Sequence, residues 1–425
     1  MRKSGRLSIA IVIGIVLGMA AGLVVHHMVT VSLDEKAAAK LATVVDAVAG
    51  GIGGTFLLLL KMIIVPLVFS SLVVGMVSAG DIRKSGKLGG KTLIYYMVTT
   101  GISVLIGMVL VNLIQPGKGL ALSSEKAPDI VTGQGDVLYV FKTMIPANPI
   151  EALATGKILS IIFVALFFGA VLTTIGKKGR PLVEFFDSLN AVMLKATGWI
   201  MYTAPLGVLG LTMGLFAKSG FDVVGPVVKY FSTVTAGLAI HAIIILPLML
   251  LIFARVNPWK FGAGMMPSLL TAFSTSSSSA TLPLTMECAE DNNGISNRVA
   301  SFVLPLGATI NMDGTALYEA VAAMTIAQAY GMQMGLGAQV TIFLTATLAA
   351  VGAAGIPSAG LVTMGIVLKA VGLPLDGIVI ILAVDRLLDM MRTTVNVWGD
   401  SVGAGIIEAW EGGGSPSAAV ERTTF

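Results

Sequence analysis

The sequence predicts an all-α polytopic membrane protein. Apolar residues make up 55% of its 425 residues and charged residues only 12%, which is about half the charged fraction of a soluble domain. Stretches of about 20 mostly apolar residues, long enough for a helix to cross a bilayer, recur along the chain. The net charge of +4 is what basic cytoplasmic loops produce and indicates no nucleic-acid partner.

The first apolar stretch, Leu7–Val25, follows three basic residues near the N-terminus. A cleaved signal peptide is the competing interpretation, but its apolar core is typically about 7–15 residues long. The longer stretch favours a retained first spanning helix. Continuous apolar stretches predict spans at Leu7–Met28, Ile52–Val77, Leu93–Ile114, Ile158–Ile175, Ala191–Leu215 and Phe231–Ala254.

Two later stretches, Val299–Ala329 and Ile378–Ile407, are long enough to span but carry polar residues. Basic clusters at Arg83–Lys91 and Lys177–Arg180 follow the second and fourth spans. Because Lys and Arg favour the cytoplasmic side, this spacing predicts a cytoplasmic N-terminus. The polar segment Pro116–Asp136 is expected to be an external loop.

Two shorter apolar segments predict re-entrant hairpins. Phe261–Phe273 runs into the serine-rich tip Ser274–Ser279, and Val340–Val351 runs into the Gly/Pro-rich tip Gly352–Gly360. After each tip the sequence becomes apolar again. Paired interrupted segments of this kind mark the binding sites of transporters. The alternative is a pair of extramembrane loops, which the near absence of charge at both tips disfavours.

A stripe of polar residues dominates the last apolar stretch. Asp385, Asp389, Arg392, Asn396 and Asp400 recur at helical spacing and fall within roughly 80° of one face. Each charge near a bilayer centre costs about 2.5–3.5 kcal/mol. The stripe is therefore expected to pair internally or bind a ligand. The alternative, a solvated extramembrane helix, conflicts with the apolar opposite face.

A second polar motif is Gly307–Thr315. Pro305, Gly307 and Gly314 can interrupt a helix and free backbone carbonyls, and Asn311-Met312-Asp313 adds an amide and a carboxylate. Such oxygens suit a hard cation such as sodium; the alternative is a polar kink in a packed helix. Farther on, Glu319 lies in an apolar stretch, where a carboxyl held neutral can carry a proton or serve as a structural acid.

The order of these motifs resembles the glutamate transporter family: serine-rich tip, Asn-Met-Asp-Gly-Thr, Gly-Ile-Pro-Ser-Ala-Gly tip and aspartate-rich last helix. That family holds archaeal aspartate carriers, bacterial glutamate and dicarboxylate symporters, and animal excitatory and neutral amino acid transporters. The resemblance covers most of the chain and is densest from Phe273 to Glu408. It implies eight transmembrane helices plus two re-entrant hairpins with inverted repeats, in an elevator-type trimer.

The resemblance also implies a domain division. Residues 1–82 hold scaffold helices 1 and 2, and residues 83–115 hold helix 3 of the transport domain. Residues 116–222 hold the external loop and scaffold helices 4 and 5. Residues 223–411 complete the transport domain with helix 6, hairpin 1, helix 7, hairpin 2 and helix 8. Residues 412–425 are expected to form a disordered tail.

Site roles follow from the same resemblance. Arg392 pairs with the substrate side-chain carboxylate, Asp389 holds the α-amino group, and Glu319 carries a proton. Further implied substrate contacts are Thr315, Thr393, Asn396, Ser277, Ser278, Ser279 and Gly360. One implied sodium site consists of Gly307, Asn311, Asn396 and Asp400. A second consists of Tyr96, Thr99, Thr100, Asn311 and Asp313. A third consists of Ala350, Val351, Ala353 and Thr309.

Two positions depart from the family pattern. Archaeal members carry an arginine where this chain has Ser276, and animal glutamate carriers carry one where it has Met390. The departures leave gating and potassium countertransport open. Glu319 matches the animal carriers and many bacterial ones.

The predicted function is secondary active symport of aspartate or glutamate across the cell inner (plasma) membrane. The expected ligands are an acidic amino acid and two to three sodium ions, with a proton as a further candidate; lipid and a homotrimer complete the expected partners. A C4-dicarboxylate symporter and an anion channel are the alternatives. No enzyme is expected: the serine-rich tip has no His or Lys partner in sequence, and one cysteine, Cys288, with three scattered histidines offers no zinc centre.

Overall fold

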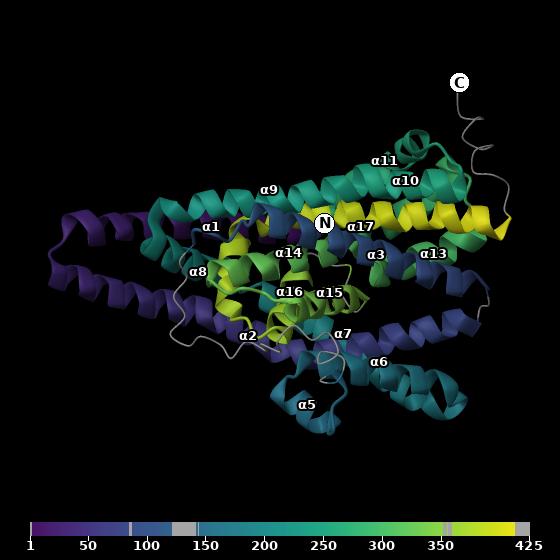
Figure 1. The fold of residues 1–425 in the computed structure, drawn as a ribbon, viewed down its shortest axis with the longest axis horizontal. Coiled ribbons are helices and arrows are strands. Elements are labelled where there is room, and N and C mark those ends of the chain that lie inside the picture. The colour runs from purple at the N-terminus through teal and green to yellow at the C-terminus, as the bar shows by residue number, and fades with distance from the viewer. Residues whose placement is uncertain are drawn as a thin grey trace.

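The computed structural model describes residues 2–84, 87–120, 142, 144–351, 355 and 359–412. These residues are mostly helical and contain no β-strand, in agreement with the predicted all-α class (Figure 1). The α-helices are α1 (Arg2–His27), α2 (Glu35–Lys84), α3 (Lys87–Ile114), α5 (Pro149–Thr155), α6 (Ile158–Thr174), α7 (Arg180–Met201), α8 (Ala204–Ser219), α9 (Val224–Ile240), α10 (Leu246–Met249), α11 (Pro258–Thr275), α12 (Ser278–Glu287), α13 (Asn297–Ile310), α14 (Asp313–Ala329), α15 (Leu336–Val351), α16 (Ala359–Ala370) and α17 (Val379–Glu411).

Short π-helical or 3₁₀ turns extend or join several of these helices. They lie at Met28–Ser32, Gly176–Gly179, Gly220–Val223, His241–Ile245, Leu250–Ala254, Cys288–Asn292 and Leu375–Ile378. The turns at His241–Ile245 and Leu250–Ala254 make α9 and α10 one continuous rod that ends at Ala254.

Four helical stretches of the described chain are long and apolar enough to cross a membrane. They are Ile9–Ser32, Glu35–Val77, Leu88–Ile114 and Ala204–Ala254. Shorter apolar helices occupy Ile158–Thr174, Leu336–Val351 and Ala359–Ala370. Many of their large apolar side chains, such as Ile9, Leu113 and Phe167, lie exposed on the protein surface. An apolar exterior of this kind is suited to hydrocarbon rather than water.

The predicted single span Ala191–Leu215 is wrong. Helix α7 ends at Met201 and α8 begins at Ala204. Pro205 stands in the first turn of α8, where its missing N–H costs least. The Thr203 hydroxyl donates to the Ile200 carbonyl and occupies an acceptor at the end of α7. The apolar pattern did not show this break because the residues on both sides are equally apolar.

Glycines bring α1 close to α8. Gly14, Gly18 and Gly22 repeat every four residues along one face of α1, and a Cβ on any of them would collide with a main-chain oxygen of α8. In a bilayer such small-residue stripes let helix backbones approach closely, because lipid offers no hydrophobic drive for helix association.

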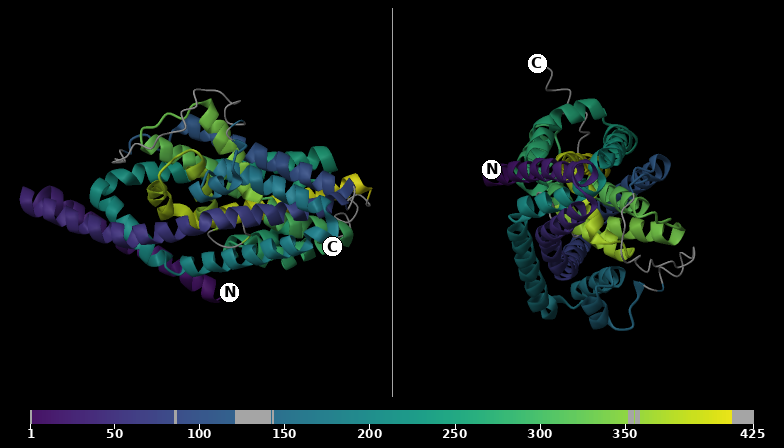
Figure 2. Two further views of the ribbon diagram at one scale, coloured as in Figure 1. Left: turned by 90° about the horizontal axis from the view of Figure 1, so that it is seen from below. Right: turned by 90° about the vertical axis from the view of Figure 1, so that its left-hand side faces the viewer.

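The helices pack in two groups. Helices α6, α7 and α8 pack on the long helix α2, and α1 packs on α8. In the second group, α3, α9 and α11–α14 pack on α17, and α15 and α16 pack on α14. In Figures 1 and 2 the junction of α1 and α2 projects beyond the other helices. Contacts of α2 with α3 and α16 join the two groups. The predicted charged stripe therefore runs through the second group.

Each predicted interruption separates two helices that pack against each other. Helices α11 and α12 pack against each other on either side of Ser276 and Ser277, and α15 packs against α16. The predicted break within Val299–Ala329 is confirmed at Asn311 and Met312, which separate α13 from α14. Most of the second tip lies outside the described residues, as do residues 121–136 of the predicted external loop and 413–425 of the predicted tail.

Candidate functional site

The polar stripe of α17 is buried within the helix bundle. Asp385, Asp389, Arg392, Asn396 and Asp400 each expose 5% of their surface or less. Burial of this kind excludes the solvated-helix alternative. A buried charge must be paired or bind a partner, so the stripe is the natural starting point for a ligand site.

Arg392 is the centre of the stripe. Its Nη2 lies 2.8 Å from Asp389 Oδ1 and 3.3 Å from Asp385 Oδ1. Its guanidinium stacks on the Tyr318 ring at 3.7 Å, and the Tyr318 hydroxyl donates to Asp385 at 2.6 Å. Nε and Nη1 are buried without a hydrogen-bond partner in the described chain. Two unpaired donors on a buried, planar cation suit a carboxylate.

Three predicted substrate contacts surround this arginine. Thr393 lies next to it and donates its hydroxyl to the Asp389 carbonyl. Asn396, one turn farther, accepts from the Gly314 N–H at 2.8 Å and donates to the Thr315 hydroxyl at 3.2 Å. These bonds tie the stripe to the first turn of α14, directly after the helix break.

The two predicted tips contact each other. The Ser277 hydroxyl donates to the Gly355 carbonyl at 2.6 Å, and the Ser279 N–H donates to that oxygen at 3.2 Å. Ser278 is buried. Gly360 in α16 faces Arg392: a Cβ there would lie 3.0 Å from Nη1. Ser277 and Ser279 therefore contact the second tip at Gly355, and Gly360 lies beside Arg392.

Ser276 begins the first tip with φ of 51°, in the left-handed region. It is buried, and its hydroxyl oxygen has no partner in the described chain. At the family's alternative arginine position, Met390 is partly buried on α17.

Hydroxyl groups of α3 lie next to the break between α13 and α14. The Thr100 hydroxyl donates to Asp313 Oδ1 at 2.7 Å and also approaches Asn311 Oδ1 at 3.4 Å. Thr99 donates to the same Asn311 oxygen at 3.3 Å, and Ser103 donates to the Asp313 carbonyl. The structure thus brings four of the five residues predicted for the second sodium site into direct contact.

The fifth, Tyr96, lies beside the first predicted sodium site. Its hydroxyl donates to the Val303 carbonyl. Asn311 donates to Asp400 Oδ1 at 3.0 Å, and a Cβ at Gly307 would collide with the same carboxylate. Asn311 therefore joins the two predicted cation sites, since its oxygen faces one and its amide nitrogen the other.

The donor set fits a hard cation. The described residues contain no group of three or more His, Cys, Asp and Glu side chains that could hold a metal ion. They instead supply carboxylate, amide, hydroxyl and carbonyl oxygens, the ligands that hard cations prefer. No lysine or arginine in the described ranges forms an ion pair with Asp313 or Asp400. Sodium ions bound here would supply the missing positive charge.

His241 is a residue of the site that sequence reasoning missed. It is fully buried, and its Nε2 lies 3.0 Å from Asp313 Oδ2, where a ring N–H donates to the carboxylate. The other ring nitrogen, Nδ1, has no partner in the described part of the chain. Three scattered histidines gave no zinc pattern, and no local spacing shows that His241 reaches a carboxylate 72 residues away.

The third predicted sodium site is only partly described. Ala350 is buried and Val351 half-buried at the end of α15, which packs against α13. Thr309 is exposed and bonds the Leu306 carbonyl of its own helix. Ala353 lies outside the described residues. This site stays a prediction.

Glu319 is completely buried in α14. Neither carboxylate oxygen has a hydrogen-bond partner in the described chain. An ionised carboxylate without a partner is costly there. A proton-carrying role for Glu319 stays a prediction.

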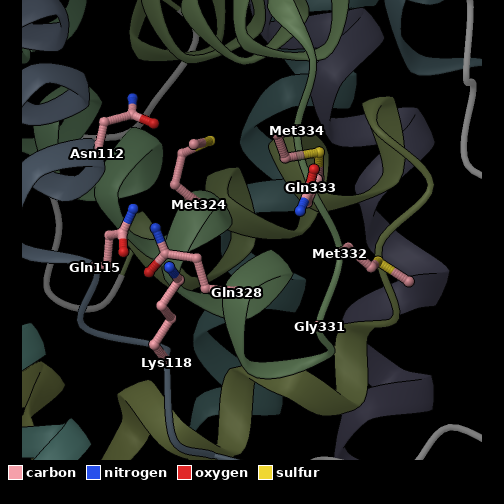
Figure 3. A pocket seen from close by; sticks show the side chains of 9 residues that line it. All are labelled: Asn112, Gln115, Lys118, Met324, Gln328, Gly331, Met332, Gln333 and Met334. Carbon is pink, nitrogen blue, oxygen red and sulfur yellow. The ribbon is translucent and has the colours of Figure 1, made fainter.

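A separate polar cavity lies at the ends of α3 and α14 (Figure 3). It has a volume of about 320 Å³. Gln328 accepts from the Gly117 N–H and donates to the Val111 carbonyl, so its amide clamps α14 to the end of α3. Among the described residues, Lys118 is the only charged side chain in its lining, and none of the predicted site residues lines it.

A broken helix and two pairs of packed helices beside buried polar groups are typical of a secondary active transporter. Comparison with known proteins agrees and is more specific. The chain belongs to the sodium:dicarboxylate symporter family, whose model matches residues 7–410. It is therefore an integral membrane protein of a transporter family and not an enzyme.

Curated relatives cover most of the chain. Excitatory amino acid transporter 1 of Ambystoma tigrinum is 42% identical over 413 residues, which cover 84% of this chain and 76% of that protein. Excitatory amino acid transporter 3 of Homo sapiens is 39% identical over 460 residues, covering 96% and 86%. A putative sodium-dependent excitatory amino acid transporter of Caenorhabditis elegans is 40% identical, covering 84% and 81%.

Proposed function

We propose that this chain is a sodium-coupled symporter of acidic amino acids, aspartate or glutamate. The observation that carries the proposal is the buried Arg392 guanidinium, which keeps Nε and Nη1 unpaired beside Gly360. A substrate side-chain carboxylate supplies the missing acceptors. The names of the relatives, which describe carriers of excitatory amino acids, support the same substrate class.

Asp389 distinguishes an amino acid from a plain dicarboxylate. Its Oδ1 pairs with Arg392 and its Oδ2 approaches Arg386 at 3.4 Å. In the proposed complex it accepts from the substrate α-amino group, which succinate lacks. Thr315, Thr393 and Asn396 supply hydrogen bonds, and the Ser277–Ser279 tip and Gly360 close over the ligand.

Two or three sodium ions drive the proposed uptake. One binds near Gly307, Asn311, Asn396 and Asp400. Another binds near Tyr96, Thr99, Thr100, Asn311 and Asp313. The third uses Thr309 and the end of α15. Glu319 carries a proton, and potassium countertransport stays open.

The proposed transport mechanism is an elevator in a homotrimer. Helices α1, α2 and α6–α8 form the scaffold, and α3 and α9–α17 form the moving domain. The packing of the helices into these two groups supports the division. The charged stripe, the helix break and both hairpins all fall in the second group, so substrate and ions travel with one body. We place the protein in the plasma membrane with its N-terminus in the cytoplasm.

Uptake into proteoliposomes tests the function. Labelled aspartate, glutamate and succinate are offered with inward sodium, proton or no gradient at clamped voltage. Saturable, sodium-driven accumulation of aspartate or glutamate in preference to succinate is expected. Preference for succinate indicates a dicarboxylate symporter. Movement that never exceeds electrochemical equilibrium indicates a channel. Either result overturns the proposal.

A further inference from the structure

An apolar groove lies outside the site described above. It has a volume of about 330 Å³ and runs between the α9–α10 rod, α11 and α17. Its lining consists of Ala242, Ile243, Pro247, Pro258, Trp259, Gly262, Ala263, Met266, Leu269, Thr394, Val395 and Trp398. The floor, from Thr394 to Trp398, occupies the α17 turns that also carry Asn396.

The polar groups of the groove floor already have partners. The Thr394 hydroxyl donates to the Met390 carbonyl at 2.9 Å. The Trp398 indole N–H donates to the Ala242 carbonyl at 3.0 Å. Both donors are thereby satisfied within the protein. An apolar groove without unsatisfied polar groups is poorly suited to water, so its occupant is apolar.

The surface around the groove identifies the kind of apolar occupant. Large apolar side chains are exposed on both walls, among them Ile243 on the rod and Met266 on α11. This face belongs to a helical stretch that is apolar enough to cross a membrane. The groove therefore opens toward hydrocarbon, where lipid acyl chains surround the protein.

One end of the groove is basic. Arg255 and Lys260 are exposed and flank Pro258 and Trp259, which line that end. No acidic residue occurs in the sequence from residue 223 to residue 286. Trp259 is 72% exposed, as is typical of an aromatic residue at a membrane–water interface. Exposed basic residues at that level attract anionic lipid headgroups.

We propose that this groove is a binding site for an anionic phospholipid. One acyl chain lies against Gly262, Ala263 and Trp398, and the headgroup phosphate binds Arg255 and Lys260. The lipid packs α11 against α17 beside the substrate-binding turns. The proposal depends on the membrane location of the chain and not on its transported substrate.

Fluorescence quenching by brominated lipids tests the acyl-chain contact. Phe replaces Trp199, Trp259 and Trp410, which leaves Trp398 as the only tryptophan. The full-length protein is reconstituted in nanodiscs with phospholipid brominated in mid-chain. Bromine quenches on contact, so Trp398 fluorescence is expected to fall. Ala263→Phe fills the groove from an exposed position and is expected to abolish the quenching. Leu270→Phe, on the same helix but outside the lining, is expected to leave it unchanged.

The headgroup arm compares brominated phosphatidylglycerol with brominated phosphatidylcholine, each diluted in unbrominated lipid. Quenching is expected at a lower mole fraction of the anionic lipid. The Arg255→Gln/Lys260→Gln variant is expected to lose this preference, whereas Lys229→Gln keeps it. Equal quenching by both lipids overturns the anionic preference.

A lipid-facing reporter makes a negative result decisive. In the protein whose four native tryptophans are Phe, Leu270→Trp places a tryptophan on the exposed face of α11. If that residue is quenched and Trp398 is not, another helix or a second copy of the chain fills the groove. Quenching of Trp398 that survives Ala263→Phe equally contradicts the site.

Discussion

Replacement of Arg392 by alanine is the sharpest test of the substrate site. The side chain is 1% exposed and is the buried cation that faces Gly360. Without it, a substrate side-chain carboxylate enters a buried site with no countercharge. Removal of one partner from a buried ion pair costs about 3–5 kcal/mol, which corresponds to a loss of affinity of roughly a hundred- to several-thousand-fold. Solvent screening is small at this exposure, so the estimate needs little reduction.

The assay is isothermal titration of purified Arg392→Ala with aspartate and with neutral serine at saturating sodium. Aspartate binding is expected to weaken by the factor above, whereas serine, which presents no side-chain carboxylate, changes little. Arg386→Ala is the matched control, because that arginine is on the same helix and contacts Asp389 only at 3.4 Å. A thermal melt verifies folding. Near-normal aspartate affinity in folded Arg392→Ala refutes the assigned role.

Three further substitutions probe neighbouring groups. Glu319→Gln keeps the shape of the side chain but cannot titrate. Sodium-dependent exchange is therefore expected to persist, while net uptake loses its dependence on a proton gradient. Equal responses of wild type and variant to the gradient contradict a proton-carrying role. His241→Phe removes the hydrogen bond to Asp313, and a lost bond to a buried charge costs about 1–3 kcal/mol. Sodium titrations are expected to show weaker sodium affinity in His241→Phe and partial recovery in His241→Gln. Unchanged sodium affinity excludes a positioning role for His241. Gly360→Ala brings a methyl group to 3.0 Å from Arg392 and is expected to weaken aspartate binding. In the control Gly335→Ala, the Cβ meets no atom within 4 Å, and normal binding is expected. Equal aspartate affinities of the two variants contradict the predicted closure at Gly360.

The sequence predicted most features that depend on local pattern. Helical spacing placed the α17 stripe on one face, and the structure buries that face. Gly and Pro with an Asn-Met-Asp turn predicted the break between α13 and α14. Each inference used residues within a few turns of one another, where backbone geometry alone decides which side chains meet.

The sequence pattern did not predict contacts between residues that lie far apart in the chain. Asp385 was seen as part of the stripe, but its bond to Tyr318 and its ion pair with Arg392 depend on how α14 packs on α17. His241 stood alone in sequence and reaches Asp313 only because α9 and α14 pack together. The turn between α7 and α8 was missed because apolar residues continue through it. In each case the contact or the helix end depends on tertiary packing, which composition and local spacing do not show.

The buried charges explain why uptake must be coupled to cations. Among the residues that the structure describes, Asp313, Asp385, Asp389 and Asp400 accompany a single buried arginine, Arg392, and an acidic amino acid adds a further net negative charge. An uncompensated charge costs about 2.5–3.5 kcal/mol near a bilayer centre. Sodium ions at the proposed sites would reduce that deficit and are therefore expected to tighten substrate binding. Linkage then requires the substrate to tighten sodium binding by the same factor. Aspartate titrations across a sodium series, at fixed ionic strength and pH, measure this coupling. An aspartate Kd that stays constant from zero to saturating sodium shows that the two sites do not communicate.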